Sequence, residues 1–277
     1  MRNNDPYPAA FSLGGSRTKA CPALPGPVTI DVSRVALGKI LPFRELYRQE
    51  MNCQIVHDSL HERGLTDSYL IRADRRPAGH GCVAGLPAEA RDVINEFYVL
   101  PAHRAAALPL FRQFAAVSQA KIIEAQTNDS LLTLMLFDCA RSIEREAILF
   151  HDAFTTKLEM PGSTFQRVSE GDRDRIFPHQ VEPVGEWMIE AGGEVVATGG
   201  IMLHYNVPYG DLYMEVAEPF RRRGYGSYLV QELKRTCYEM GRIPAARCQA
   251  SNETSRATLQ RAGLLPCAHV LRGVIVA

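Results

Sequence analysis

Apolar positions along the first half of the chain alternate between helical and strand-like spacing. Helical spacing predicts helices over residues 40–51, 108–119 and 128–140. Short apolar runs bounded by turn residues predict strands at residues 69–71, 81–84, 93–99, 122–125, 147–154 and 155–160. This interleaving of strands and helices is typical of a mixed α/β fold.

The same order of elements returns in the second half. It predicts strands at residues 187–190, 195–197, 212–216, 245–249 and 270–276, and helices over residues 226–240 and 252–261. The letters repeat as well: residues 98–104 align with residues 215–221, and residues 128–130 align with residues 252–254. Two copies of one α/β unit are the simplest interpretation, and chance similarity of two strand–loop–helix segments is the alternative.

Three parts of the chain follow from this repeat. Residues 1–27 hold five prolines in a polar context and are expected to form a flexible N-terminal arm. Residues 28–160 are predicted to form the first domain, and residues 161–277 the second.

The amino-acid composition argues against several classes of binding partner and metal site. Lys and Arg together number 31, and so do Asp and Glu, which argues against a nucleic-acid or anionic-membrane partner. Seven scattered cysteines without a Cys-x-x-Cys pair argue against a disulfide framework and a thiolate zinc site. Because no signal peptide or long apolar run stands out, we expect a cytoplasmic protein with reduced, mostly buried thiols.

One loop in the second half carries a pattern that predicts chemistry. The strand that ends at Val216 runs into Arg221-Arg222-Arg223-Gly224-Tyr225-Gly226, and a helix follows. The first N–H groups of a helix lack partners inside it, and glycines let a ligand approach them. Together with three guanidinium groups, they predict a diphosphate site. The loop fits neither a Walker A sequence nor the three-glycine dinucleotide pattern.

This stretch resembles motif A of the GNAT superfamily of N-acetyltransferases, Arg/Gln-x-x-Gly-x-Gly/Ala, through Arg221, Gly224 and Gly226. Residues 252–264 are similar to the family's next helix. The resemblance covers residues 165–277 well and residues 28–160 weakly. It implies two tandem GNAT-like α/β domains, each a twisted, mostly antiparallel sheet with helices on both faces.

The resemblance also implies a reaction: the second domain binds acetyl-CoA as co-substrate and moves the acetyl group directly to a primary amine, without a metal. The acceptor is a small-molecule or peptide amine. Backbone groups at Val216 and Ala217 would contact the pantetheine arm, with Asn252 and Ser255 near it. The pyrophosphate would be held by Arg221, Arg222, Arg223, Gly224, Tyr225, Gly226 and Ser227.

The first copy departs from this pattern at the matching loop. Residues 105–109 read Ala-Ala-Ala-Leu-Pro where the second copy has residues 222–226. The alanines carry no charge, and Pro109 lacks a backbone donor. We therefore predict a degenerate first domain that has lost acetyl-CoA binding and serves as scaffold and as one wall of the substrate cleft.

Acylation of an amine needs a group that takes a proton and a group that returns one to the CoA thiolate. Glu215 is the first candidate for the base, and a salt-bridged strand carboxylate is the alternative interpretation. Weaker candidates are Asp211, His204, Tyr205 and Glu186. The usual acid of many family members, a Tyr seven residues after the helix Asn, is replaced by Leu259.

Two other hypotheses stay open. A non-catalytic acyl-CoA-binding or sensory protein is the main alternative, because Leu259 cannot act as an acid. The other is a scaffold or interaction protein in which neither copy is active, and the intact glycine loop of the second copy argues against it. The pair His57-x-x-x-His61 has metal-ligand spacing on a helix, but without a third ligand it predicts an exposed helical pair.

Overall fold

The computed structural model describes residues 28–51, 54, 58–85 and 90–276. The predicted arm, Cys21, Cys53 and His57 therefore lie outside the described residues. The described chain folds into one mixed sheet of twelve strands with helices packed on it. Among these residues, no helix is long and apolar enough to cross a membrane.

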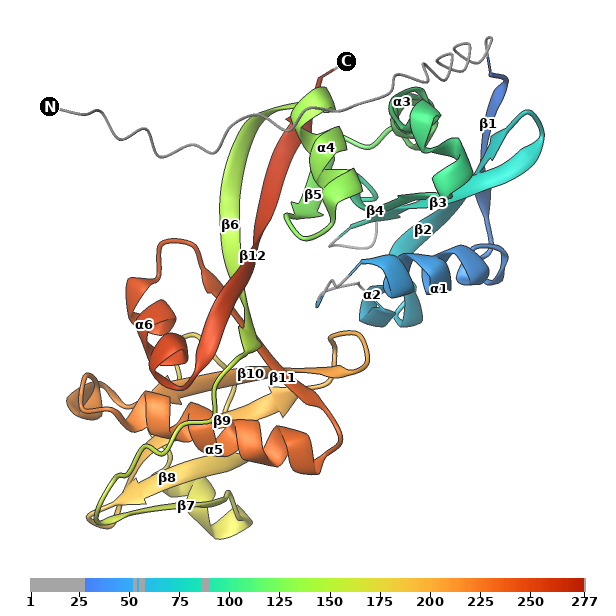
Figure 1. Ribbon diagram of the computed structural model, residues 1–277. Coiled ribbons are helices and arrows are strands. Elements are labelled where there is room, and N and C mark those ends of the chain that lie inside the picture. Colours follow the sequence, from blue (N-terminus) through green and yellow to red (C-terminus); the bar gives the residue numbers. More distant parts are fainter. Residues whose placement is uncertain (1–27, 52–53, 55–57, 86–89, 277) are drawn as a thin grey trace, which may run out of the picture.

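The first half builds one lobe (Figure 1). Its strands are β1 (Ile30–Val35), β2 (Thr66–Ala73), β3 (Arg76–Ala84), β4 (Val93–Val99), β5 (Ile122–Gln126) and β6 (Ala140–Asp152). Its helices are η1 (Leu37–Lys39), α1 (Leu41–Glu50), α2 (Asp58–Glu62), η2 (Pro101–Ala106), α3 (Ala107–Ser118) and α4 (Ser130–Cys139). Alternate strand residues face opposite helix layers: Phe97 packs with Phe111 of α3, and Tyr98 packs with Tyr47 of α1.

The second half builds the other lobe. Its strands are β7 (Ser163–Arg167), β8 (Trp187–Ala191), β9 (Glu194–Met202), β10 (Tyr209–Val216), β11 (Ile243–Gln249) and β12 (Leu264–Ile275). Its helices are η3 (Glu170–Arg175), η4 (Glu218–Phe220), α5 (Tyr225–Glu239) and α6 (Glu253–Arg261). Leu212 and Leu229 lie in one core cluster, so that face of β10 packs against α5.

The two lobes exchange strands. The strand order is β1-β2-β3-β4-β5-β12-β6-β11-β10-β9-β8-β7. β12, at the end of the chain, pairs with β5 of the first lobe, and β6 pairs with β11 of the second. β6 and β12 also pair with each other along their length, and they form the ribbon that joins the lobes in Figure 1. Each copy therefore completes the sheet of the other.

Most predicted elements are present. The predicted strand at residues 147–154 is the end of β6, but the partner strand predicted at residues 155–160 is wrong. The structure has one long strand, β6, and residues 153–160 form no strand. The first part of β6 is largely exposed and carries charged residues, so no apolar run marks it in the sequence. β12 likewise begins at Leu264, six residues before the predicted strand. No sequence pattern marked β1 or β7, and α2 was indicated only by the helical spacing of His57 and His61.

The internal repeat is visible in contacts as well as in letters. Arg104 Nε donates to the carbonyl oxygen of Val99 at 3.1 Å, and Arg221 Nε donates to the carbonyl oxygen of Val216 at 3.1 Å. These two pairs match under the sequence alignment. The same arginine position therefore ties down the end of the central strand in both copies.

Candidate functional site

A wedge opens between β10 and β11. Their parallel pairing ends at Asp211, opposite Ala245. Beyond that point β10 stays paired with β9 as far as Val216, and β11 stays paired with β6 as far as Gln249. The two strands diverge because each follows its outer neighbour.

The wedge is lined by backbone groups of β10. The N–H of Ala217 donates to the carbonyl oxygen of Val196 on β9 at 2.9 Å. In an antiparallel pair, successive residues direct their backbone groups alternately toward and away from the partner strand. Met214 and Val216 therefore direct their N–H groups into the wedge. An extended ligand chain would pair with these two residues, whereas the Ala217 N–H is already engaged.

The loop after β10 presents further N–H groups. Arg222 and Gly224 have positive φ values of 62° and 97°, and they turn the chain into α5. The first bond of that helix runs from the N–H of Tyr228 to the carbonyl oxygen of Gly224, at 3.0 Å. The N–H groups of residues 225–227 therefore have no partner inside the helix. These are the groups that the sequence predicts as an anion site, and such N–H groups at a helix start favour a bound anion.

The arginines of this loop have different surroundings. Arg221 bends back toward β10, where its Nη2 lies 3.8 Å from Glu215 Oε1. Arg223 lies over the ring of Phe220, with 5.4 Å between its Cζ and the ring centroid. Arg221 thus has a structural contact, as its counterpart does in the first copy, while Arg222 and Arg223 are exposed beside the loop.

A fourth guanidinium was missed in the sequence. Arg261, in the last turn of α6, comes within 3.9 Å of the position that a Cβ on Gly224 would occupy. Its place on a neighbouring helix gives it no sequence link to the loop. It adds a positive charge to the predicted diphosphate site.

Other predicted cofactor residues hold the site together. The Ser227 hydroxyl donates to the carbonyl oxygen of Thr258 at 3.1 Å, which joins α5 to α6. The Asn252 side chain caps α6 by accepting from the N–H of Ser255 at 3.0 Å. The ring of Tyr225 meets that of Phe220 edge-on. These contacts occupy the side-chain groups of Ser227 and Asn252.

The first copy keeps the wedge and lacks the loop. β4 and β5 pair only at Val93–Ile122 and Ile94–Ile123 before they separate. At the matching loop, η2 ends at Ala106 and α3 begins at the next residue, whereas residues 221–224 separate η4 from α5. The two copies therefore differ in the loop on which the predicted diphosphate site depends, and a single site in the second copy stays a prediction.

Glu215 anchors a segment of the second lobe. Its carboxylate accepts hydrogen bonds from the N–H groups of Gln180, Val181 and Glu182, at 3.0, 3.1 and 3.0 Å. Burial works to raise the pKa of Glu215, but these three donors prevail and lower it. A carboxylate that is held ionised in this way is a weak proton acceptor. The geometry thus favours the structural interpretation of Glu215 over the base.

A Glu215→Gln variant is expected to lose stability in a pH-dependent manner. The folded-state pKa lies below the unfolded value, so the carboxylate stabilises the fold above pH 4.5. That contribution disappears as pH falls through the folded-state pKa. Urea unfolding should show the largest gap from the wild type at pH 7 and a smaller gap near pH 3. Glu186→Gln, which alters an exposed carboxylate paired with Arg167, should leave the profile unchanged.

A histidine–aspartate pair lies at the vertex of the wedge. His204 Nε2 is 3.1 Å from Asp211 Oδ2, and the side chains are 34% and 8% exposed. Asp211 is the last β10 residue paired with β11. Its neighbour Leu212 faces α5, so the Asp211 side chain lies on the opposite face of the sheet. The Tyr205 ring stands edge-on to His204, and burial, aided by the Asp211 charge, raises the pKa of Tyr205 well above its usual range.

Glu182 lies near the same pair and was missed in the sequence. Burial and then the Asp211 charge raise the pKa of its carboxyl. Glu182 lies in an irregular segment whose sequence has no helical or strand periodicity, so no sequence pattern indicates that it is near the site. By contrast, Glu186 is exposed and pairs with Arg167 at 3.0 Å.

A cavity of about 690 Å³ is lined by residues between Arg167 and Glu186. This is the segment whose residues 180–182 donate to the Glu215 carboxylate. The lining of the cavity includes Phe177 and His179, whose rings stack with centroids 4.8 Å apart. His179 Nδ1 lies 3.6 Å from Glu215 Oε2. The cavity therefore adjoins the face of β10 that carries Asp211 and Glu215.

Leu259 is 4% exposed and belongs to the core cluster of the second lobe. The position of the usual Tyr acid is thus filled by an apolar side chain that packs between α6 and the sheet. This residue has no polar group with which to return a proton.

The comparisons with known proteins agree with this geometry. Residues 152–264 match the Acetyltransferase (GNAT) family. No curated protein matches the chain in sequence. Among solved structures, an acetyltransferase from the GNAT family of Colwellia psychrerythraea is similar over 89% of this chain and 100% of its own, with 13% identity and a TM-score of 0.70.

Two further structures share the arrangement of both lobes. A tandem GNAT protein from the clavulanic acid biosynthesis pathway is similar over 90% of this chain and 99% of its own, with 10% identity and a TM-score of 0.58. A GCN5-related N-acetyltransferase from Sphaerobacter thermophilus is similar over 90% and 96%, with 16% identity and a TM-score of 0.53. At these identities the likeness establishes the fold, which is that of two tandem GNAT-like domains.

Proposed function

We propose that this chain, whose residues 152–264 match the Acetyltransferase (GNAT) family, is an N-acetyltransferase that uses acetyl-CoA and acts on a primary amine. The observation that carries this proposal is the wedge between β10 and β11, which ends on the unpaired N–H groups of residues 225–227. Acetyl-CoA would supply an acetyl thioester there. Met214 and Val216 would bind its extended arm, and the glycine loop its diphosphate.

The chain's own groups would handle the proton of the amine. The amine nitrogen forms a bond to the acetyl carbon, the carbon–sulfur bond breaks, and the amine loses a proton. His204, oriented by Asp211 and open to solvent, is placed to take that proton. With Leu259 in the position of the usual acid, we propose that water protonates the departing thiolate.

The proposal is tested by thiol release. The purified chain is mixed with acetyl-CoA and a panel of primary amines, and free CoA thiol is measured with time. We expect release above the hydrolysis background for at least one amine class, together with the matching acetylated amine by mass spectrometry.

The second candidate is a non-catalytic acyl-CoA-binding protein. It is favoured by one observation, the buried Leu259 where an acid is usual. It predicts tight binding of acetyl-CoA by calorimetry and no thiol release with any amine in the panel. Absence of binding would contradict both candidates.

A further inference from the structure

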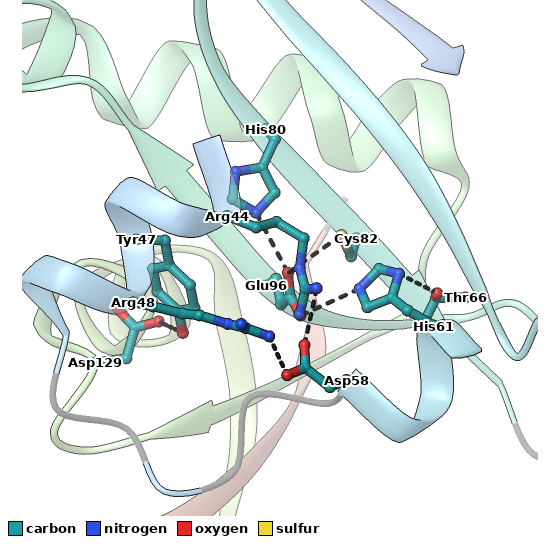
Figure 2. Close-up of polar contacts among 10 residues, drawn as sticks. All are labelled: Arg44, Tyr47, Arg48, Asp58, His61, Thr66, His80, Cys82, Glu96 and Asp129. Atoms are coloured by element: carbon teal, nitrogen blue, oxygen red, sulfur yellow. Dashed lines mark hydrogen bonds and ion pairs between the residues drawn. The ribbon is translucent and has the colours of Figure 1, made fainter. Parts of the chain in front are cut away.

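A second polar cluster lies in the first lobe, far in sequence from the glycine loop. Figure 2 shows Glu96 of β4 at its centre, with side chains from α1, α2 and β3 converging on it. His61 Nε2 lies 3.2 Å from Oε1 of Glu96, while His80 Nε2 and Cys82 Sγ lie 3.3 and 3.4 Å from Oε2. All four side chains are at least nine-tenths buried. The sequence prediction of an exposed helical histidine is therefore wrong for His61.

The carboxylate of Glu96 has more donors around it than it can use. Arg44 donates to both oxygens at 2.8 Å, in addition to the three groups already named. A carboxylate offers about four lone-pair sites, and five nitrogen and sulfur atoms surround them: two of Arg44 and one each of His61, His80 and Cys82. The Nδ1 of His80 has no hydrogen-bond partner among the described residues. This unpartnered atom is the ring nitrogen of His80 that does not face Glu96.

We propose that this cluster is a zinc site, with His61, Cys82 and Glu96 as its three protein ligands. The ligand atoms of His61, Cys82 and Glu96 all lie within 4.8 Å of one another. Zinc bonds of about 2.0–2.3 Å in a tetrahedron place neighbouring donor atoms about 3.3–3.5 Å apart. His61 Nε2 lies 3.2 Å from Oε1 of Glu96 and Cys82 Sγ lies 3.4 Å from Oε2, so both donors are within such a distance of a carboxylate oxygen, each of a different one.

The groups behind the ligands support the same assignment. His61 Nδ1 lies 2.7 Å from the Thr66 hydroxyl, so a proton on Nδ1 bonds Thr66 and leaves the Nε2 lone pair for the metal. A ligating histidine almost always has such an outer partner. Arg44 is the outer partner of the carboxylate, and its Nη1 also contacts Asp58 at 2.9 Å. Asp58 offsets part of the positive charge that a metal would meet.

Zinc suits this donor set better than a hard cation. One thiolate and imidazole nitrogen favour zinc, whereas magnesium and calcium prefer oxygen ligands. Binding replaces the thiol proton of Cys82, which is released to solvent as the metal–sulfur bond forms.

The test uses the full chain, unfolded with chelator and refolded with cobalt(II) or zinc(II). We expect one equivalent of bound metal and, with cobalt, a thiolate charge-transfer band with strong visible bands of tetrahedral coordination. The Cys82→Ala variant should lose the charge-transfer band. Cys139→Ala, at another buried cysteine of the same lobe, should keep it.

Thermal unfolding supplies a second readout. Zinc should raise the midpoint of the wild type and of Cys139→Ala, and should leave Cys82→Ala unchanged. The proposal is overturned if the wild type refolds without bound metal, or if the charge-transfer band survives in Cys82→Ala. Either result would make the cluster an internal ion-pair network that holds α1 and α2 on the sheet.

Discussion

Gly224→Ala is expected to weaken acetyl-CoA binding by roughly tenfold or more. Gly224 has a φ of 97°, and a left-handed conformation costs an L-residue roughly 1–2 kcal/mol. A Cβ at this position would meet nothing closer than the Met160 sulfur at 3.6 Å, so the effect is conformational rather than steric. Relief of the strain turns the N–H groups of residues 225–227 away from the wedge. Calorimetric titration with acetyl-CoA measures the loss.

Gly241→Ala is the matched control. Gly241 follows α5 at its far end, has a φ of 71°, and has open space around its Cβ position. It should lose a comparable amount of stability and bind acetyl-CoA as the wild type does. Equal affinity in Gly224→Ala and the wild type would remove the loop from the binding site.

Most helices and strands could be predicted from the sequence because the spacing of apolar residues reflects which face of each element is buried. The strands predicted at residues 187–190 and 195–197 are present as β8 and β9, which pair as an antiparallel hairpin. The helix over residues 226–240 was predicted from apolar spacing and is present as α5. The strand exchange was not predicted, because a strand pattern shows that a segment pairs but does not show with which strand it pairs.

The conformation of the glycine loop could be predicted from sequence because its proposed role rests on backbone N–H groups, and glycine positions indicate where the backbone turns. The proton-handling groups were harder to rank. Glu215 and Asp211 alternate on the same face of β10, and the sequence favoured Glu215. Only the structure shows that residues 180–182 occupy the Glu215 carboxylate, while Asp211 meets His204.

The two copies share one part of their structure and differ in another. Both keep the wedge and the arginine that ties the strand end, at Arg104 and Arg221. The second copy adds the glycine loop. The first fills the opposite face of its sheet with the buried cluster around Glu96. Strand exchange joins the two sheets, so loss of the loop in the first copy does not remove its role in the fold.

His204→Ala is expected to lower kcat about 100- to 1000-fold, the range for loss of a general base. Affinity for acetyl-CoA should not change, because His204 lies on the face of β10 opposite α5 and the glycine loop. Asp211→Asn keeps the shape of the pair and removes the charge that orients the imidazole, so kcat should fall by about tenfold. Steady-state thiol release with the best amine of the panel measures both.

His103→Ala is the control, since His103 is a half-buried histidine on η2 of the first lobe, away from the wedge of the second. It should leave kcat unchanged. An unaltered kcat in His204→Ala would exclude this histidine and move the role to Glu182. Glu182 is the better placed of the remaining carboxyls, because its raised pKa increases its proton affinity, whereas the backbone donors around Glu215 lower the pKa of that group. Glu182→Gln would then carry the loss in kcat.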